Sequence, residues 1–225
     1  MASVFDQTTG NPLTGANLHV VCTETGEEVD YTFESMDLDG QDFIDGIFKP
    51  EQSYTVTASF DGYLSKTIRL NFEGVQKDKK APYDFDLEEA VLNKDYDMPQ
   101  VLFPFASAEL LINESVNSAD SLTYLIDLLE ENENLVIKVK SHTDSRGSAK
   151  DNMTLSQQRA ETCVNYLVDN GIPMARLRPE GFGESQLLVS DAEIAQLGKA
   201  DQEKAHQVNR RTVFEILSFD YKPED

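Results

Sequence analysis

The chain has 225 residues, of which 40% are hydrophobic and eight are proline, a composition typical of globular domains rather than of disordered chains. Its 41 acidic and 19 basic residues give a net charge of −22, which argues against nucleic acid or anionic lipid as a partner of the bulk surface, because such partners need basic patches. No apolar run has the length that a membrane span requires, and the start, MASVFDQTTGNPLTG, has no signal-peptide pattern. We expect the chain to be a piece of a longer protein.

Residues 1–90 have the pattern of β-strands throughout. The segments NLHVVCT, EVDYTF, SYTVTASF and YLSKTIRLNF are alternating or rich in β-branched residues, turn signals such as TTGNPLTG separate them, and YDFDLEEA predicts a last strand. Because no stretch has helical periodicity, we predict an all-β domain over residues 1–90, a small antiparallel sandwich. Asp37, Asp39 and Asp42 in DLDGQD could suggest calcium, but the acids do not follow the EF-hand order and a turn is the better interpretation.

Residues 91–98 are predicted to be a linker, because Pro99 disfavours a helical conformation of the residue before it. A second domain is predicted over residues 99–218, and residues 219–225 form a tail. The predicted elements in chain order are a strand (100–105), an amphipathic helix (113–135), a strand (135–141), a helix (155–173) with Ser156 as its N-cap, a strand (177–185), a short helix within 191–211 and a strand (212–217). This order, β-α-β-α-β-β with an insertion before the last strand, predicts an α+β domain with the helices on one face of a small mixed sheet.

The two cysteines offer neither a disulfide nor a metal site. Cys22 and Cys163 lie in different predicted domains, and no Cys/His cluster has zinc-site spacing. The sequence thus gives no reason to expect a metal or another cofactor.

The second domain resembles a known family in several motifs. HTDSRG, N-x-x-LSQQRA, NGIP, RLRPEGFGES and NRRTVFEIL occur in the order seen in the OmpA C-terminal-like peptidoglycan-binding domain, and the resemblance covers residues 100–217. The long insertion before NRRT resembles the version found in Bacteroidota. More loosely, VFDQTTGNPLTGANLHV and YTVTASFDGYLSKTIRL resemble the carboxypeptidase regulatory-like or transthyretin-like sandwich, a non-catalytic accessory module.

The resemblance implies a binding function and not an enzyme. The implied partner is the stem peptide of peptidoglycan with meso-diaminopimelate, and the implied role is to anchor an outer-membrane-associated complex to the cell wall in the periplasm. The first domain would contact other envelope proteins. The alternative is a protein-interaction hub of an envelope or secretion complex, such as a type IX-like system, with a weakened or lost peptidoglycan site.

The free end of diaminopimelate carries an ammonium and a carboxylate on one carbon, so a receptor needs one acceptor and one cationic donor. The resemblance assigns the ammonium to Asp144 and the carboxylate to Arg159, in a bidentate pair. It also places Asn152, Thr143, Leu155 and Arg210 around the pocket. Where the family usually has an acid or amide after its first strand, this chain has Ala106, and Ser107 or backbone amides are expected to substitute.

Simpler interpretations stay open for each residue. Asp144 and Arg159 could form a mutual surface salt bridge, a contact that contributes only about 0–1 kcal/mol. Asn152 could be a plain turn residue and Leu155 a core residue, and Arg210 with Arg211 could hold the insertion in place. His142 beside Asp144 could suggest an acid–base pair, but no nucleophile or second histidine accompanies it in a related motif.

Overall fold

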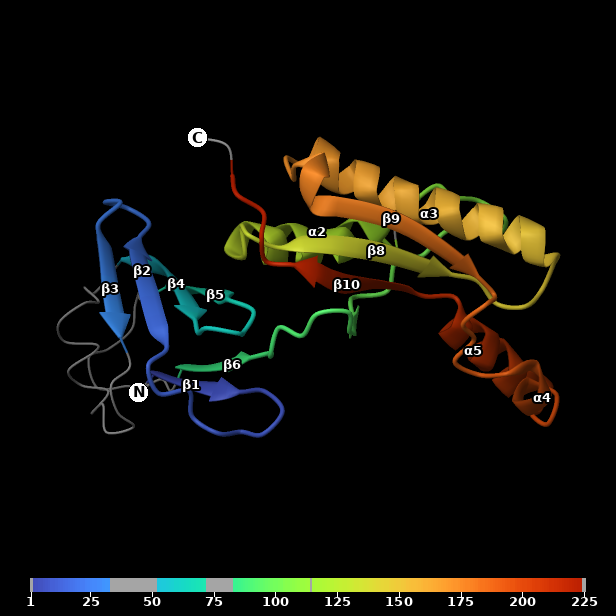
Figure 1. Ribbon diagram of the computed structural model, residues 1–225, viewed down its shortest axis with the longest axis horizontal. Coiled ribbons are helices and arrows are strands. Elements are labelled where there is room, and N and C mark those ends of the chain that lie inside the picture. Colours follow the sequence, from blue (N-terminus) through green and yellow to red (C-terminus); the bar gives the residue numbers. More distant parts are fainter. Residues whose placement is uncertain (1, 33–51, 72–82, 114, 224–225) are drawn as a thin grey trace. The chain divides into compact units, whose positions relative to one another are not determined.

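The computed structural model describes residues 2–32, 52–71, 83–113 and 115–223, which form two compact units, Met1–Val91 and Leu92–Asp225 (Figure 1). Asp37, Asp39 and Asp42 lie outside the described residues.

The first unit consists of strands in two sheets. Four antiparallel strands have the order β3-β2-β4-β5, and β1 pairs in parallel with β6. The strands are β1 (Ala2–Asp6), β2 (Asn17–Cys22), β3 (Glu28–Thr32), β4 (Ser53–Ser59), β5 (Lys66–Asn71) and β6 (Tyr83–Leu87). Among the residues that the structure describes here, none is helical, so an all-strand first unit agrees with the prediction. The parallel β1–β6 pair departs from the purely antiparallel arrangement expected of the sandwich.

Both sheets of the first unit share one hydrophobic core. Val4 and Phe85 from the parallel pair belong to the same buried cluster as Leu18, Val20 and Val56 from the four-stranded sheet. Side chains of β4 alternate between buried and half-buried positions along the strand, as expected where one face of a sheet packs on a core. The shared core therefore helps to hold the parallel pair against the larger sheet.

The second unit is a mixed sheet with helices. Its strand order is β7-β10-β8-β9, in which β8 and β9 are parallel and β10 is antiparallel to β8 and β7. Its elements are β7 (Asp95–Asp97), α2 (Ser118–Glu131), β8 (Val136–His142), α3 (Ala149–Asp169), the 3₁₀ turn Met174–Arg176, β9 (Leu177–Gly183), α4 (Asp191–Ile194), α5 (Lys199–Asn209) and β10 (Thr212–Ser218). The prediction of helices with a small mixed sheet is confirmed.

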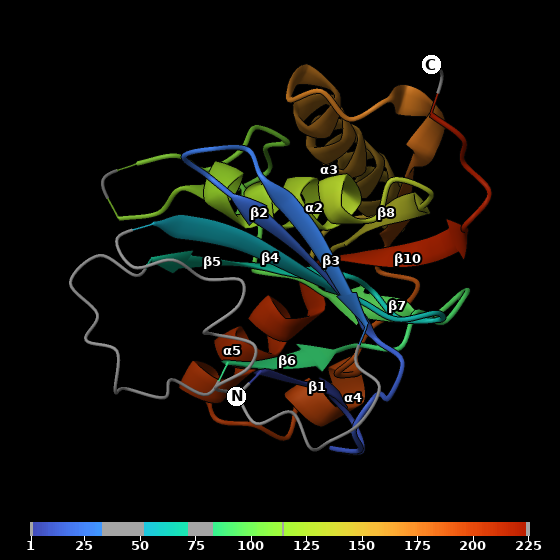
Figure 2. The same cartoon turned by 90° about the vertical axis from the view of Figure 1, so that its left-hand side faces the viewer.

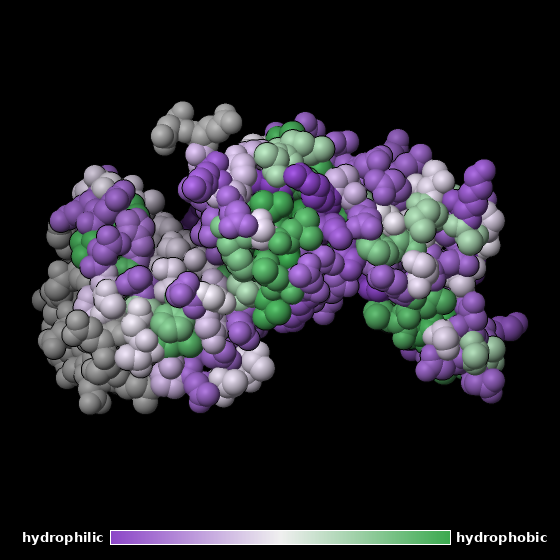
Figure 3. All heavy atoms as spheres, in the orientation of Figure 1, coloured by the Kyte–Doolittle hydropathy of each residue, from purple (hydrophilic) through white to green (hydrophobic). Residues whose placement is uncertain are grey.

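Helices α2 and α3 cover one face of this sheet (Figure 2). Ile137 and Val139 of β8 point to that face and are fully buried. The opposite face carries charged side chains: Lys140 binds Asp95 at 2.7 Å and Glu215 at 3.1 Å. Figure 3 shows hydrophilic side chains over much of this unit in the same view as Figure 1. The alternation of β8 thus separates a dry helix-covered face from a face of ion pairs.

The predicted first strand of this unit is misplaced. Residues 100–105 form no strand, whereas β7 lies inside the segment 91–98 that the sequence predicts as linker. Pro104 lacks a backbone donor, and β7 instead gains its place by pairing with β10 and by stacking Tyr96 on Phe214 at 5.1 Å.

The N-cap of the second helix is also wrong. Helix α3 begins at Ala149, two turns before the predicted start, and its N-cap is Ser148, whose side chain accepts from the Asp151 N–H. Ser156 lies within the helix, fully buried, and accepts a hydrogen bond from the Gly183 N–H at 2.8 Å. At the other end, Gly171 adopts a positive φ of 98°, as predicted for a helix stop.

Within the described ranges, no helix has the length and apolar character that crossing a membrane requires.

Candidate functional site

A pocket of about 770 Å³ opens where β8 ends and α3 begins. Its walls come from four parts of the second unit: residues 101–106, the loop that follows β8, the first half of α3, and α5 with the residues just after it. Asp144, Arg159, Asn152, Thr143 and Leu155 all line it. Arg210 lines it as well, and Ser107 does not. The structure therefore brings six of the seven residues named from the sequence into one cavity.

Asp144 lies in the loop after β8 and is bound by two arginines. Its Oδ2 accepts from Arg146 Nη2 at 2.7 Å and Nε at 3.1 Å, and also from Arg210 Nη1. Its Oδ1 accepts the Arg146 backbone N–H at 3.0 Å. Burial alone would raise the pKa of Asp144, but hydrogen bonds from Arg146 and Arg210 outweigh it and lower the pKa. The carboxylate is thus held in its charged form.

Arg159 lies on α3 and is 7% exposed. Its Nε donates to the Ser107 carbonyl at 2.9 Å, Nη2 lies 3.4 Å from the Pro104 carbonyl, and the guanidinium lies 4.7 Å from the centre of the Phe103 ring. Among the described residues no carboxylate lies within salt-bridge distance of Arg159. Burial, followed by the nearby positive charge of Arg210, lowers the pKa of Arg159. The expected alternative, a mutual Asp144–Arg159 salt bridge, is not formed.

A second buried arginine gives a useful comparison. Arg176 is 4% exposed and also hydrogen-bonds only to carbonyls, those of Leu135, Leu129 and Asn132, while its guanidinium lies 5.5 Å from the centre of the Tyr221 ring. Those carbonyls lie at and just beyond the C-terminal end of α2, where a cation is favourable. Arg176 does not line the pocket, and its contacts are those of a residue that caps the C-terminal end of a helix. Arg159, in contrast, faces a cavity.

The turn that holds Arg159 is formed by Pro104–Ser107. The Ser107 N–H donates to the Pro104 carbonyl at 3.1 Å, and Ala106 has a φ of 52°. This is the third position of a type II turn, which favours Gly or Asn, so the acid or amide expected at position 106 suits the backbone there. The Ser107 side chain does not take that place in the pocket wall: its hydroxyl accepts from the Glu109 N–H, and only its carbonyl binds Arg159.

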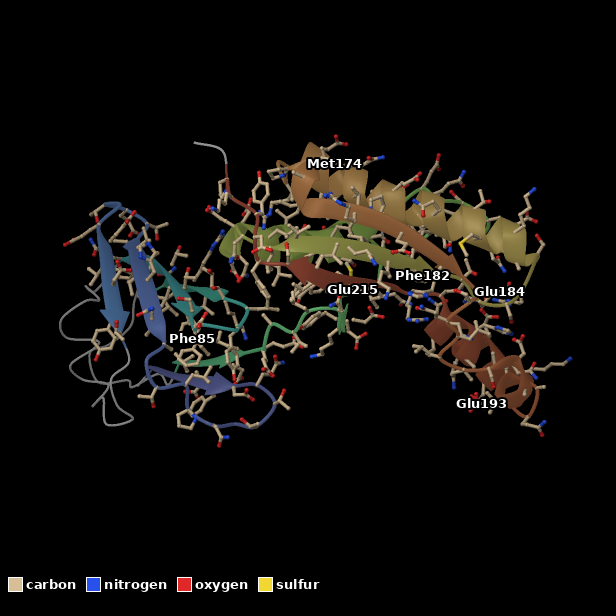
Figure 4. The ribbon with its side chains drawn as sticks, in the orientation of Figure 1. Phe85, Met174, Phe182, Glu184, Glu193 and Glu215 are labelled. Carbon is tan, nitrogen blue, oxygen red and sulfur yellow. The ribbon has the colours of Figure 1, made fainter. Side chains whose placement is uncertain are left out.

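Asn152 organises the loop that carries Asp144. Its Nδ2 donates to the carbonyls of Asp144 and Arg146, both at 3.2 Å, and to Glu184 Oε2 at 2.6 Å. It does so from the first turn of α3 and not from a turn of its own. Glu184, labelled in Figure 4, follows β9, so this contact also joins the loop to the end of that strand. Asn152 thus holds the loop from within a helix and is not a plain turn residue.

Thr143 and Leu155 form other parts of the pocket wall. The Thr143 N–H donates to the Gly183 carbonyl at 2.9 Å, but its hydroxyl is buried and has no hydrogen-bond partner. Leu155 on α3 is half-buried and gives an apolar wall. A buried hydroxyl without a partner beside a cavity is available to a ligand.

Two residues of the site were missed from the sequence, Arg146 and Glu203. Glu203 on α5 accepts from Arg146 Nη1 at 2.9 Å and from Arg210 Nη2 at 2.8 Å. Arg146 stood in the motif HTDSRG, so its position was visible, but no local pattern predicts a contact between residues 57 positions apart. The insertion therefore supplies one wall of the pocket through α5.

The pocket lining carries more positive than negative side chains, although the chain as a whole is acidic. The charged residues that line it are four arginines, Arg146, Arg159, Arg210 and Arg211, and three acids, Asp144, Asp151 and Glu203. The lining residues thus carry an excess of one positive charge on a chain whose net charge is −22, a local balance that suits an anionic group. In the part of the chain that the structure describes, no group of three metal-ligating side chains occurs.

His142 does not form an acid–base pair with Asp144. Both of its ring nitrogens are buried without a hydrogen-bond partner, and the ring stacks on Phe182 at 5.2 Å (Phe182 is labelled in Figure 4). Burial, then the positive charges of Arg211 and Lys140, lower the pKa of His142 to about 4, against a smaller opposing effect of Asp95. The ring is therefore neutral in the folded protein near pH 7.

His142 predicts a loss of stability in mild acid. Below its usual pKa of 6.5 the unfolded chain protonates this histidine, and the folded protein does so only near pH 4, so stability falls as the pH drops through that window. Between pH 7 and pH 5 the parent should lose about 2 kcal/mol more than His142→Phe, which keeps the stack on Phe182. Urea unfolding at both pH values measures the difference, and equal losses in the two proteins would contradict the assignment.

Sequence comparison relates this part of the chain to known proteins. Residues 102–200 match the model of the OmpA family. The peptidoglycan-associated lipoprotein of Buchnera aphidicola is 31% identical over 115 residues, which cover 50% of this chain and 58% of that protein. Outer membrane protein A of Shimwellia blattae is 39% identical over 85 residues, which cover 38% of this chain and 34% of that protein.

A solved structure of a MotB-like protein from Desulfovibrio vulgaris is 28% identical, with a TM-score of 0.39 and coverage of 52% of this chain and 69% of that one. The chain spans between about a quarter and three fifths of the length of the curated relatives it matches. Residues 102–200, which hold α2, β8, α3, β9 and most of the pocket wall, are similar to the OmpA family.

Proposed function

We propose that the second unit is a non-catalytic binding module for the stem peptide of peptidoglycan, and that its pocket holds the zwitterionic end of diaminopimelate. In this proposal Arg159 binds the ligand carboxylate and Asp144 accepts from the ligand ammonium. A planar guanidinium matches a carboxylate with two parallel hydrogen bonds, and a carboxylate has only acceptors to offer. Similarity to a peptidoglycan-associated lipoprotein supports the ligand class.

The observation that carries the proposal is the state of Arg159. A buried charge without an opposite charge is costly, and Arg159 keeps only carbonyl and aromatic partners at the wall of an open cavity. A ligand carboxylate would supply the missing anion. The unpartnered Thr143 hydroxyl lines the same cavity and offers a further contact.

The proposal gives the chain a place in the cell envelope. A module that binds the wall and has relatives named as outer-membrane proteins and lipoproteins suits a periplasmic protein that anchors an outer-membrane-associated complex. In this view the first unit, proposed as a carboxypeptidase regulatory-like sandwich, is the part that contacts other envelope proteins. We also propose that the second unit is of the type found in Bacteroidota and that the complex is related to type IX secretion.

The test is sedimentation of the full chain with purified sacculi. The parent should pellet with sacculi whose stems contain diaminopimelate, and less with sacculi whose stems contain lysine, because lysine lacks the carboxylate at that carbon. Asp144→Ala and Arg159→Ala should each stay in the supernatant, since loss of one partner of a buried charge pair costs about 2–5 kcal/mol of binding. Arg178→Ala is the matched control, because this arginine bonds mainly to its neighbouring carbonyls outside the pocket. If both pocket variants pellet like the parent, the site is wrong.

A protein-interaction hub is the second candidate. The observation that favours it is that Asp144 already has two arginine partners, so the pocket has an internal substitute for part of a ligand. Titration with a diaminopimelate-containing stem peptide, followed by backbone NMR, separates the two functions. Shifts of the amides near Asp144 support wall binding, and a titration without shifts supports the hub.

A further inference from the structure

The Oδ2 atom of Asp144 is saturated by the protein itself. Three arginine N–H groups, two from Arg146 and one from Arg210, point at Oδ2, and a backbone N–H occupies Oδ1. A carboxylate has two acceptor oxygens, which together offer about four lone-pair positions. Oδ2 has about two of these positions and already receives three donors, so a ligand ammonium can bind this oxygen only if one of the arginines leaves.

Arg146 is the donor that is placed to leave. Its side chain is 53% exposed, whereas the side chains of Arg210 and Asp144 are 25% and 8% exposed. It is a loop residue, while Arg210 follows α5 directly and is also held by Glu203 and Gln207. Departure of Arg146 leaves Asp144 with Arg210 and with the ligand, so the buried carboxylate keeps cationic partners throughout.

Glu203 gives Arg146 a second anchor. It accepts from Arg146 Nη1 at 2.9 Å, with another contact to Nη2 at 3.4 Å, and its side chain is 58% exposed at the edge of the pocket. Arg146 is thus held between a buried carboxylate and an exposed one. When Arg146 leaves Asp144, it can keep its ion pair with Glu203 and need not cross the cavity.

We propose that Arg146 and Glu203 determine the specificity of this pocket by exchange: Arg146 is an internal cation that a ligand ammonium replaces at Asp144, and Glu203 holds Arg146 once it is displaced. This inference rests on the proposed function. A ligand with a carboxylate but no ammonium can bind Arg159, yet it cannot replace Arg146 and gains nothing at Asp144. The insertion that carries α5 thereby takes part in selecting the zwitterion.

Calorimetric titration of the full chain tests the exchange, with two forms of one diaminopimelate tripeptide. One form has the free ammonium, and in the other the ammonium is acetylated. Arg146→Gln removes the competing cation, so it should bind the free peptide about threefold more tightly or better, the scale of one exposed ion pair. Binding of the acetylated peptide should stay the same. Lys204→Gln is the control with the same charge change on α5.

Glu203→Gln should have the opposite effect. Without its second anchor Arg146 rests on Asp144 alone, so the free peptide should bind about threefold more weakly. In the double variant with Arg146→Gln that loss should disappear, which is the coupling that a double-mutant cycle measures. Asp201→Asn is the control with the same charge change on the same helix. Urea unfolding of each variant checks that these exposed substitutions leave the fold intact.

The outcomes separate this inference from the function it rests on. If the parent binds the free peptide and Arg146→Gln binds it equally or more weakly, Arg146 contacts the ligand or takes no part, and the exchange is refuted. If the parent binds neither peptide, or binds both equally, the zwitterion grip itself is refuted.

Discussion

Replacing Arg159 with methionine will abolish binding of the stem peptide and leave the protein as stable as the parent, or more stable. Methionine fills much of the same volume without a charge, and a buried arginine with no carboxylate partner contributes little net stability. The two carbonyls left behind, Ser107 and Pro104, belong to a half-buried turn beside the cavity where water can reach them. Peptide affinity should fall by about 30-fold or more, since one partner of a desolvated charge pair is removed.

Arg176→Met is the matched control for this substitution. Both arginines are buried and bond only to carbonyls, but those of Arg176 are enclosed near the end of α2. Removing it leaves buried acceptors unsatisfied, each of which costs about 1–3 kcal/mol. Urea unfolding and peptide titration of both variants should therefore give opposite patterns: Arg176→Met loses stability and keeps affinity, Arg159→Met keeps stability and loses affinity. A large stability loss in Arg159→Met with intact binding would make it a structural residue.

Opposed patterns of this kind are expected where a residue serves a ligand and not the fold. A binding site keeps charges in places that folding alone would not favour, because the ligand supplies the missing partner. The lowered pKa values of Arg159 and of Arg176 share burial as their main cause, so burial by itself does not identify the functional arginine. The open cavity next to Arg159 is the reason that we propose Arg159, and not Arg176, as the binding residue.

The parts of the site that could be predicted from the sequence are those fixed by local order. Asp144, Asn152 and Arg159 belong to one strand–loop–helix unit, and their short separation along the chain places them at one end of the sheet. The secondary-structure type of β8 and α3 followed from their hydrophobic periods. The start of α3 was missed because Ser156 has the residue type of a cap, and only the Gly183 contact shows that it is a core residue.

The parts that could not be predicted depend on contacts distant in sequence. Strand β7 has three residues, two of them acidic, and exists because β10 lies beside it. The β1–β6 pair joins residues at the two ends of the first unit. Glu203 reaches the pocket because α5 is positioned by Asn209, whose side chain holds the backbone of Leu188 and Val189. No periodicity or motif in the sequence predicts these contacts.

Gly181→Ala should have a large effect, because of the described glycines Gly181 leaves the least room for a Cβ. Gly181 of β9 faces α3, and a Cβ there would lie 2.2 Å from the Gln157 backbone N and 2.6 Å from its Cα. Those atoms belong to the helix backbone, so no side-chain rotation relieves the clash. Gly181→Ala should destabilise the unit by about 3 kcal/mol or more, at or above the usual cost of overpacking. Chemical denaturation followed by circular dichroism measures this loss.

The same substitution should weaken peptide binding, because the clash falls between Ser156 and Gln157, on the helix that positions Asn152 and Arg159. Gly198→Ala is the control: a Cβ at Gly198 meets no atom within 4 Å, and its φ of −66° suits alanine, so stability should change by less than about 1 kcal/mol and affinity not at all. If Gly181→Ala unfolds like Gly198→Ala, helix α3 does not approach β9 this closely. The packing of α3 on β9, which places Arg159 at the pocket, would then be wrong.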